Sequence, residues 1–190
     1  MRLIIGLGNP GKEYLNSRHN VGFRVVDRFA EKKQLKINQK KFNGLYVSFL
    51  HNDEKIMLLK PQCFMNNSGE VVKKFIDYYQ ISVEDILVLY DDYYIEVGDF
   101  KLKASGSSAG HNGLKSIEKH IDSKNYKRIK IGISRDQQML LSDYVLSKFS
   151  KEQLKEIDKI TEKLVIVLDD YLDWDFDKLM SIYNEKKDKV

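Results

Sequence analysis

The sequence predicts an α/β fold, in which a single domain has a twisted mixed β-sheet flanked by helices and a helical C-terminal segment. Short apolar runs rich in Ile, Val and Leu alternate with segments of helical period, as they do in α/β proteins. The stretch "LHNDEK" connects two of these runs in too few residues for a parallel crossover, so the sheet must include an antiparallel pair. From Ser150 onward the pattern is helical alone.

Six runs have the length and the β-branched content expected of strands. They are residues 2–7, 44–50, 55–60, 86–90, 100–103 and 129–134. Helical period appears between some of them, in "VGFRVVDRFAEKK", in "SGEVVKKFIDYYQ" and after "GHNG". Ser150 and Gln153 form a capping-box pattern ahead of a long apolar stripe, and a last helix is expected over residues 176–186.

Length and composition indicate one globular domain over residues 1–190. The net charge of +4 is mildly basic, and two lysine clusters, within residues 32–41 and 101–130, are either a solvated surface or a nucleic-acid interface. The single cysteine, Cys63, excludes an internal disulfide. No apolar run approaches the roughly 20 residues of a membrane helix, and the N-terminal run is too short for a secretion signal. We therefore expect a cytoplasmic protein without membrane contact.

The loop "GLGNPG", from Gly6 to Gly11, matches the dinucleotide pattern G-x-G-x-x-G without its context. In a dinucleotide site the last glycine opens a helix, and an acidic residue follows about 20 positions on, at the end of the next strand. Here "KEYLNSRHN" precedes the helical pattern, and Asp27 lies inside that pattern. A tight turn, in which Gly6 and Gly8 permit a close backbone approach, explains the glycines better.

The stretch "GSSAG" matches the nucleophile elbow G-x-S-x-G around Ser108, again without its context. A polar, lysine-rich segment precedes it, and His111 follows too soon to complete an elbow triad. A flexible loop of small residues is the preferred interpretation, and a serine esterase that depends on Ser108 remains an alternative. No Cys or His pattern has metal-ligand spacing, so no metal is expected.

Polar residues follow several predicted strands, where the ligand crevice of an open α/β sheet lies. They are Asn9, His19, Asn20, Asn66, Asp91, His111 and Asn112. A histidine backed by a carboxylate is a general base, and asparagine amides can donate to a developing oxyanion. Since no serine or thiol has the setting of a nucleophile, the base would activate water, which suits hydrolysis of an ester. Taken singly, each residue is more often a turn or cap residue.

Six segments, in their order along the chain, resemble the bacterial peptidyl-tRNA hydrolase family. They are "GLGNPGKEYLNSRHNVGF", "LLKPQCFMNNSGEVV", "YDDYYIEVGDFKLK", "SGSSAGHNGLKSI", "YKRIKIGIS" and "DYVLSKF". They cover nearly everything up to about Phe149 and are far more specific than either short pattern. The resemblance implies an enzyme that cleaves the ester between a peptide, or an N-blocked amino acid, and the 3′ end of tRNA without metal or cofactor. It also implies peptidyl-tRNA as the partner, no obligate protein partner and a monomer.

The resemblance assigns four residues to catalysis. It implies that His19 activates water and that Asp91 holds this histidine in its basic form. Asn9 is implied to distinguish N-blocked from free aminoacyl-tRNA, and Asn112 is implied to face the reacting carbonyl.

Substrate-binding roles are implied for a further group. The cleft residues are Tyr14, Phe64, Met65, Asn66, His111 and Asn112, with Asn66 and Asn112 against the peptide. The basic patch that contacts tRNA phosphates falls on Lys103 and Lys130, where affinity depends on salt rather than on base sequence.

Several positions depart from the family pattern. Ser17 and Cys63 each replace a usual threonine, "DDYYI" replaces a "DDLDL"-like run at the cleft rim, and "GISRD" departs from "GIGRP". Lys130 stands where arginine is common, which removes bidentate phosphate binding. Because these departures remove no implied catalytic group, a hydrolase is favoured over a related RNA-binding module that has lost catalysis.

Overall fold

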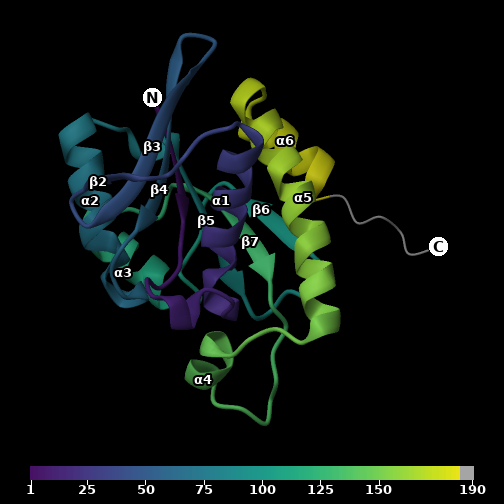
Figure 1. Cartoon of the computed structure of the whole chain (residues 1–190). Helices are drawn as coiled ribbons and strands as arrows, with labels where there is room; N and C mark the ends of the chain where they lie inside the picture. Colours follow the sequence, from purple (N-terminus) through teal and green to yellow (C-terminus); the bar gives the residue numbers. More distant parts are fainter. Residues whose placement is uncertain (185–190) are drawn as a thin grey trace.

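The computed structural model describes residues 1–184 and contains one seven-stranded sheet (Figure 1). Its strands are β1 (Arg2–Gly6), β2 (Gln39–Lys41), β3 (Gly44–His51), β4 (Glu54–Pro61), β5 (Ile86–Asp92), β6 (Phe100–Lys103) and β7 (Lys127–Gly132). They lie in the spatial order β2-β3-β4-β1-β5-β7-β6. The central strands β4, β1, β5 and β7 are parallel, and β2, β3 and β6 pair antiparallel, so the predicted mixed sheet is confirmed.

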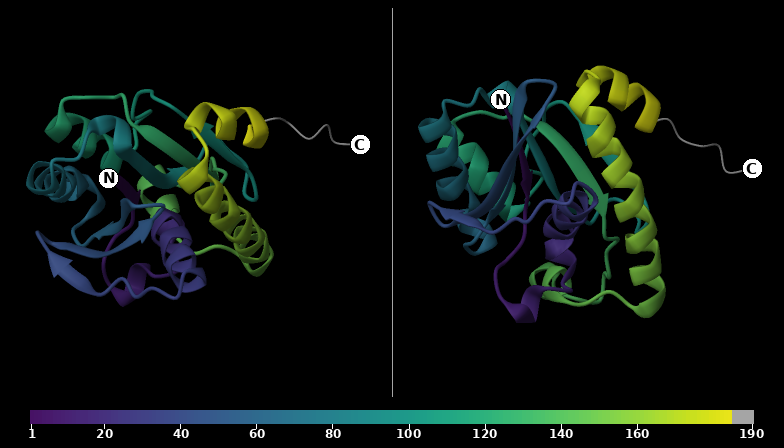
Figure 2. Two further views of the ribbon diagram at one scale, coloured as in Figure 1. Left: turned by 90° about the horizontal axis from the view of Figure 1, so that it is seen from above. Right: turned by 45° about the horizontal axis from the view of Figure 1, so that its top comes forward.

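Helices cover both faces of this sheet (Figures 1 and 2). They are α1 (Val21–Lys32), α2 (Ser68–Tyr79), α3 (Asn112–Ile121), α4 (Leu141–Leu146), α5 (Lys151–Asp173) and α6 (Phe176–Tyr183). The long helix α5 packs beside α1 on one face, and α2 packs beside α3 on the other. None of the helices within residues 1–184 combines the length and apolarity needed to cross a bilayer.

Side-chain alternation along β1 explains why its sequence is apolar without interruption. Ile4 points into the core beneath α1 and α5, whereas Leu3 and Ile5 point into the core beneath α2 and α3, and all three are fully buried. A strand covered by helices on both faces has no polar side. The same arrangement accounts for the apolar run of β5, which is buried throughout.

Gly6, in the first loop, and Gly22, in α1, lie where two backbones meet. A Cβ on Gly6 would lie 2.5 Å from the carbonyl oxygen of Gly22 in α1. One on Gly22 would lie 2.6 Å from the amide nitrogen of Leu7. The N-terminus of α1 can approach β1 this closely only because neither residue has a side chain. The tight-turn interpretation of "GLGNPG" fits this packing.

The predicted elements are present, and the bounds of β1, β3, β4, β5 and β7 differ from the predicted ones by one or two residues. The capping box at Ser150 and the β3–β4 hairpin are confirmed. Strand β7 starts at residue 127 rather than 129 and ends at residue 132 rather than 134. The short elements β2 and α4 were not predicted, because their three and six residues are too few to show a period. Helix α6 ends at Tyr183, and residues 185–186 of the predicted last helix lie outside the described part.

Candidate active site

The sheet topology brings residues at the ends of three strands together at one edge. Because β4, β1 and β5 are parallel, their carboxyl ends lie side by side. Asn9 follows β1, Met65 follows β4 and Asp91 lies at the end of β5. Helix α1 starts beside β1, and α2 leads from β4 to β5 on the opposite face, so this edge is a topological switch point. Ligand crevices form at such points in open α/β sheets.

Asp91 lies between two histidine rings. Its Oδ1 is 2.7 Å from Nδ1 of His19 and 3.0 Å from Nε2 of His111. His19 comes from the 3₁₀ turn Arg18–Asn20, just ahead of α1, and His111 is the N-cap of α3. The amide N–H of Leu114 donates to Nδ1 of His111 over 3.3 Å. Neutral His111 therefore carries its proton on Nε2 and donates it to Asp91.

The same reasoning fixes the tautomer of His19. Asp91 can accept only if Nδ1 of His19 carries the proton, which leaves the lone pair of neutral His19 on Nε2. His19 is 7% exposed and Asp91 is 2% exposed, so water barely competes for their hydrogen bond. Burial alone raises the pKa of Asp91, but the neighbouring His19 and His111 rings and their hydrogen bonds outweigh it and lower that pKa overall. Asp91 is thus ionised behind a basic imidazole nitrogen.

Asn9 is held in place through both its backbone and its side chain. Its N–H donates to Oδ1 of Asn20 over 2.8 Å, and its carbonyl accepts from Nδ2 of Asn20 over 2.9 Å. Its side-chain Oδ1 accepts from the backbone N–H of Met65 over 2.7 Å. Because Oδ1 is occupied, Nδ2 is the part of the Asn9 amide left to donate to a ligand. Asn20 was among the polar residues expected near the crevice, but no catalytic or binding role was predicted for it.

Arg18 connects the His19 turn to the C-terminal third of the chain. Its guanidinium lies over the rings of Tyr144 and Phe149, at 4.3 and 4.6 Å from their centroids. It donates to Oγ of Ser147 over 3.1 Å and to Oε1 of Gln153 over 2.8 Å. Sequence reasoning missed this contact, because its partners are more than 120 residues away and none forms a local motif with Arg18.

The remaining predicted cleft residues have different environments. Asn66 and Asn112 are exposed and line one hollow of about 300 Å³ between α2 and α3, so the structure brings this pair together. Phe64 is 59% exposed, whereas Met65 is 4% exposed. Tyr14 ends the 3₁₀ turn Lys12–Tyr14 and is half-buried. No hydrogen bond in the described part of the chain joins it to the His19–Asp91 pair.

The two predicted phosphate-binding lysines differ in whether their charge is available to a ligand. Lys103 is exposed on β6, and its register partner on β7 is Arg128. Lys130 pairs in register with Lys101, which places these basic side chains on one face of the sheet. The Nζ of Lys130, however, lies 2.5 Å from Oδ2 of the buried Asp92, which offsets its charge. Asp92 was not predicted as a partner.

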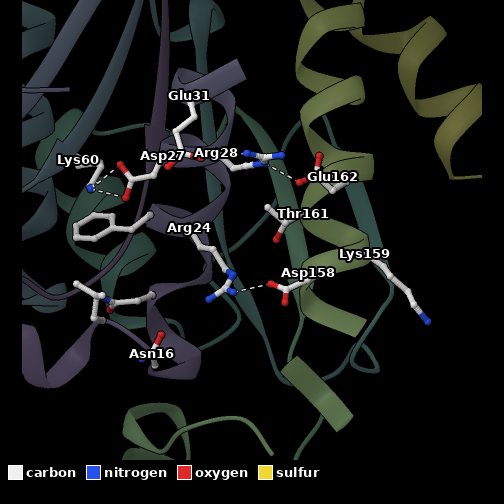
Figure 3. Close-up of a pocket in the computed structure, with 13 residues that line it drawn as sticks. Asn16, Arg24, Asp27, Arg28, Glu31, Lys60, Asp158, Lys159, Thr161 and Glu162 are labelled. Atoms are coloured by element: carbon white, nitrogen blue, oxygen red, sulfur yellow. Dashed lines mark hydrogen bonds and ion pairs between the residues drawn. The ribbon is translucent and has the colours of Figure 1, made fainter. Parts of the chain in front are cut away.

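A separate hollow of about 600 Å³ lies between α1 and α5 (Figure 3). Ion pairs cross or border it, with Arg24–Asp158 at 2.5 Å, Arg28–Glu162 at 2.6 Å and Lys60–Asp27 at 2.6 Å. Neither His19 nor Asp91 lines this hollow. The ion pairs across the hollow connect α1 to α5. Because these charged side chains already have partners, the hollow offers no reactive group.

The geometry disfavours two other chemistries, metal binding and a serine nucleophile. His19, Asp91 and His111 bring three potential metal-ligand atoms within 4.8 Å of one another. Both ring nitrogens, however, point at the same carboxylate oxygen, so an ion would have to replace two hydrogen bonds. Ser108 lies in the loop between β6 and α3, with neither a strand directly before it nor a helix directly after it. The nucleophile-elbow context is therefore missing there.

Comparisons with known proteins agree with this architecture. A family model described as "Peptidyl-tRNA hydrolase" matches residues 3–190. The peptidyl-tRNA hydrolase of Bacillus subtilis (strain 168) is 43% identical over 187 residues, which are 98% of this chain and 100% of that protein. That of Ligilactobacillus salivarius (strain UCC118) is 42% identical over 97% of this chain and 100% of its own length. The crystal structure of peptidyl-tRNA hydrolase from Acinetobacter baumannii superposes with a TM-score of 0.91 at 33% identity, covering 98% of this chain and 96% of the other.

Proposed function

The chain belongs to the peptidyl-tRNA hydrolase family, whose members are enzymes that hydrolyse the ester bond of peptidyl-tRNA, and we propose that it cleaves this bond with water activated by His19. The observation that carries the proposal is the buried hydrogen bond of 2.7 Å between Nδ1 of His19 and Asp91. This bond leaves Nε2 of His19 as the one ring nitrogen able to take a proton.

The reaction follows from this arrangement. Nε2 of His19 takes a proton from water while the water oxygen bonds to the ester carbonyl carbon. Asp91 stabilises the imidazolium that forms, and the amide groups of Asn9 and Asn112 donate to the carbonyl oxygen as it becomes negative. When the tetrahedral intermediate collapses, the imidazolium returns the proton to the departing ribose oxygen of tRNA. The products are the free peptide acid and free tRNA.

The magnitudes suit an ester. A positioned general base contributes about 10²–10⁴-fold, and one oxyanion donor contributes about 10²–10³-fold. Together they supply about 10⁴–10⁷-fold without a covalent intermediate. In this proposal Tyr14, Phe64, Met65, Asn66 and His111 surround the peptidyl end of the substrate.

The RNA part of the substrate would meet the lysine face of β6 and β7. Exposed Lys101 and Lys103 supply a salt-dependent attraction to phosphates that is blind to base sequence. Lys130 contributes less, because Asp92 already neutralises it. We further propose that the enzyme acts as a cytoplasmic monomer with peptidyl-tRNA as its partner, as the single cysteine and the family suggest.

Hydrolysis of N-acetyl-aminoacyl-tRNA in the presence of EDTA tests the proposal. We expect release of the blocked amino acid, loss of activity in His19→Ala and near-normal activity in Ser108→Ala. His51→Ala is the matched control, because Nε2 of His51 also lies 2.7 Å from a carboxylate, that of Asp173, at the exposed β3–β4 hairpin. Wild-type activity in His19→Ala, or activity that requires added metal, would overturn the mechanism.

A further inference from the structure

Two adjacent tyrosines extend from the end of β5, directly after Asp91 and Asp92. The ring centroids of Tyr93 and Tyr94 are 4.3 Å apart with an interplanar angle of 38°, and their hydroxyl oxygens are 3.2 Å apart. Tyr94 is 70% exposed, so the ring surface turned away from Tyr93 faces solvent. The pair therefore presents an aromatic surface to solvent, two residues along the chain from Asp91.

The pair is held in position by its surroundings. Tyr93 packs with its inner side against the core beneath α1 and α5. The guanidinium carbon of Arg135 lies 5.4 Å from the centre of its ring. The backbone N–H of Tyr94 donates to Oδ1 of Asp92 over 2.8 Å. The tyrosines are therefore a preformed surface whose ordering cost is met on folding, which favours ligand binding.

Two contacts connect this surface to the loop of His111 and to the lysine face. A Cβ built on Gly110, the residue before His111, would lie 3.9 Å from the Tyr93 hydroxyl oxygen. On the other side, Asp92 binds the Tyr94 amide through Oδ1 and the Lys130 ammonium through Oδ2. The tyrosines therefore neighbour both the loop that carries His111 and the carboxylate that binds Lys130.

We propose that Tyr93 and Tyr94 form a stacking platform for the unpaired 3′-terminal nucleobase of the RNA substrate. This inference rests on the proposed function and adds a binding site to it. Every nucleobase has a π-face, so an aromatic ring binds single-stranded RNA with little dependence on sequence. Arg135 over Tyr93 adds a positive charge next to the phosphates that flank the base.

The test measures the affinity of wild-type protein for a deacylated RNA minihelix with an unpaired 3′ end, which cannot be hydrolysed. A second minihelix lacks only the 3′-terminal base. In Tyr94→Leu we expect the base-bearing RNA to bind about 5- to 100-fold more weakly, the range of base–aromatic stacking. Removal of the base should then cost no further affinity. Tyr94→Phe keeps the ring and should bind like wild type.

Tyr78→Leu is the matched control, because Tyr78 is 59% exposed and has the Lys41 ammonium 3.4 Å from its ring centre, yet it lies on α2. It should bind both RNAs like wild type. The platform is refuted if Tyr94→Leu and wild type lose the same affinity when the base is removed. Hydrolysis by wild type and by His19→Ala is measured in parallel, so failure of the proposed function would appear as absent or His19-independent activity. Failure of the platform alone would leave that activity and its dependence on His19 intact.

Discussion

Replacing Asn20 by Ala removes the two hydrogen bonds that hold the backbone of Asn9. Both bonds are buried, at 2.8 and 2.9 Å, and Asn20 is 5% exposed. Each typical hydrogen bond contributes about 1 kcal/mol net, and each buried group left unpaired costs about 1–3 kcal/mol. The amide and carbonyl of Asn9 would both lose their partner, so we expect a loss of about 2–6 kcal/mol. That is a large part of the roughly 5–15 kcal/mol that stabilises a domain.

The same substitution should slow the reaction, because the Asn9 side chain would no longer be aimed by a fixed backbone. A catalytic donor displaced by about 1 Å can cost 10²-fold, so we expect kcat to fall about 10- to 100-fold. Urea unfolding gives the stability change, and hydrolysis of saturating N-acetyl-aminoacyl-tRNA gives kcat. If Asn20 acts through Asn9, the double variant Asn9→Ala/Asn20→Ala should be no slower than Asn9→Ala alone.

Asn184 provides the control, because it makes the same pair of bonds to another backbone. Its Oδ1 accepts from the Leu102 N–H at 2.8 Å, and its Nδ2 donates to the Leu102 carbonyl at 2.9 Å. Asn184→Ala should lower stability, by less than Asn20→Ala because Asn184 is only half-buried, and should leave kcat unchanged. Equal losses of kcat in both variants, or an unchanged kcat in Asn20→Ala, would refute the reasoning.

Three further predictions concern charged and titratable groups. The pKa of Asp91 is lowered from the ordinary carboxyl value of 3.8, so its carboxylate stabilises the fold above pH 3.8. This contribution to stability is lost as the pH falls below 3.8. The difference in the free energy of unfolding between wild type and Asp91→Asn, measured in urea, should therefore shrink between about pH 5 and about pH 2. A difference that stays constant over this range would contradict the predicted direction of the pKa shift. Burial, with the nearby carboxylate of Glu70, raises the pKa of Cys63 to about 11. Alkylation of Cys63 by iodoacetamide should consequently be slow near neutral pH and accelerate toward that value, and a half-maximal rate at the ordinary thiol pKa of about 8.5 would argue against burial. Lys103→Ala should reduce the slope of log tRNA affinity against log salt concentration by about 1, whereas Lys130→Ala should reduce it less. Equal reductions would show that Asp92 does not neutralise Lys130.

Much of the fold was readable from local pattern. The alternation of apolar runs and helical segments depends on neighbours in sequence, and it predicted the sheet, the main helices and the Ser150 cap. Asn9 and Asp91 were placed at strand ends by the same reasoning, and His19 was placed at the close of the first loop. Their common location then followed from the parallel order of the strands that carry them.

The missed features depend on contacts between distant segments. The partners of Arg18 lie far along the chain, and the ion pair of Lys130 with Asp92 crosses between two strands. Neither contact changes hydrophobic periodicity, so no local pattern reports it. The shared bond of Asp91 to two histidines is of the same kind, since His111 comes from a loop after the strand of Asp91.

The anchoring of Arg18 has a consequence for the order in which the molecule becomes active. Arg18, in the turn that presents His19, leaves the ribosome 129 residues ahead of Ser147 and 135 residues ahead of Gln153, the two residues that fix it. A nascent chain that ends near residue 134 holds every strand but lacks this anchor. We therefore expect His19 to gain its final position late, when the C-terminal helices dock, and a truncated product to carry His19 and Asp91 without the anchored turn.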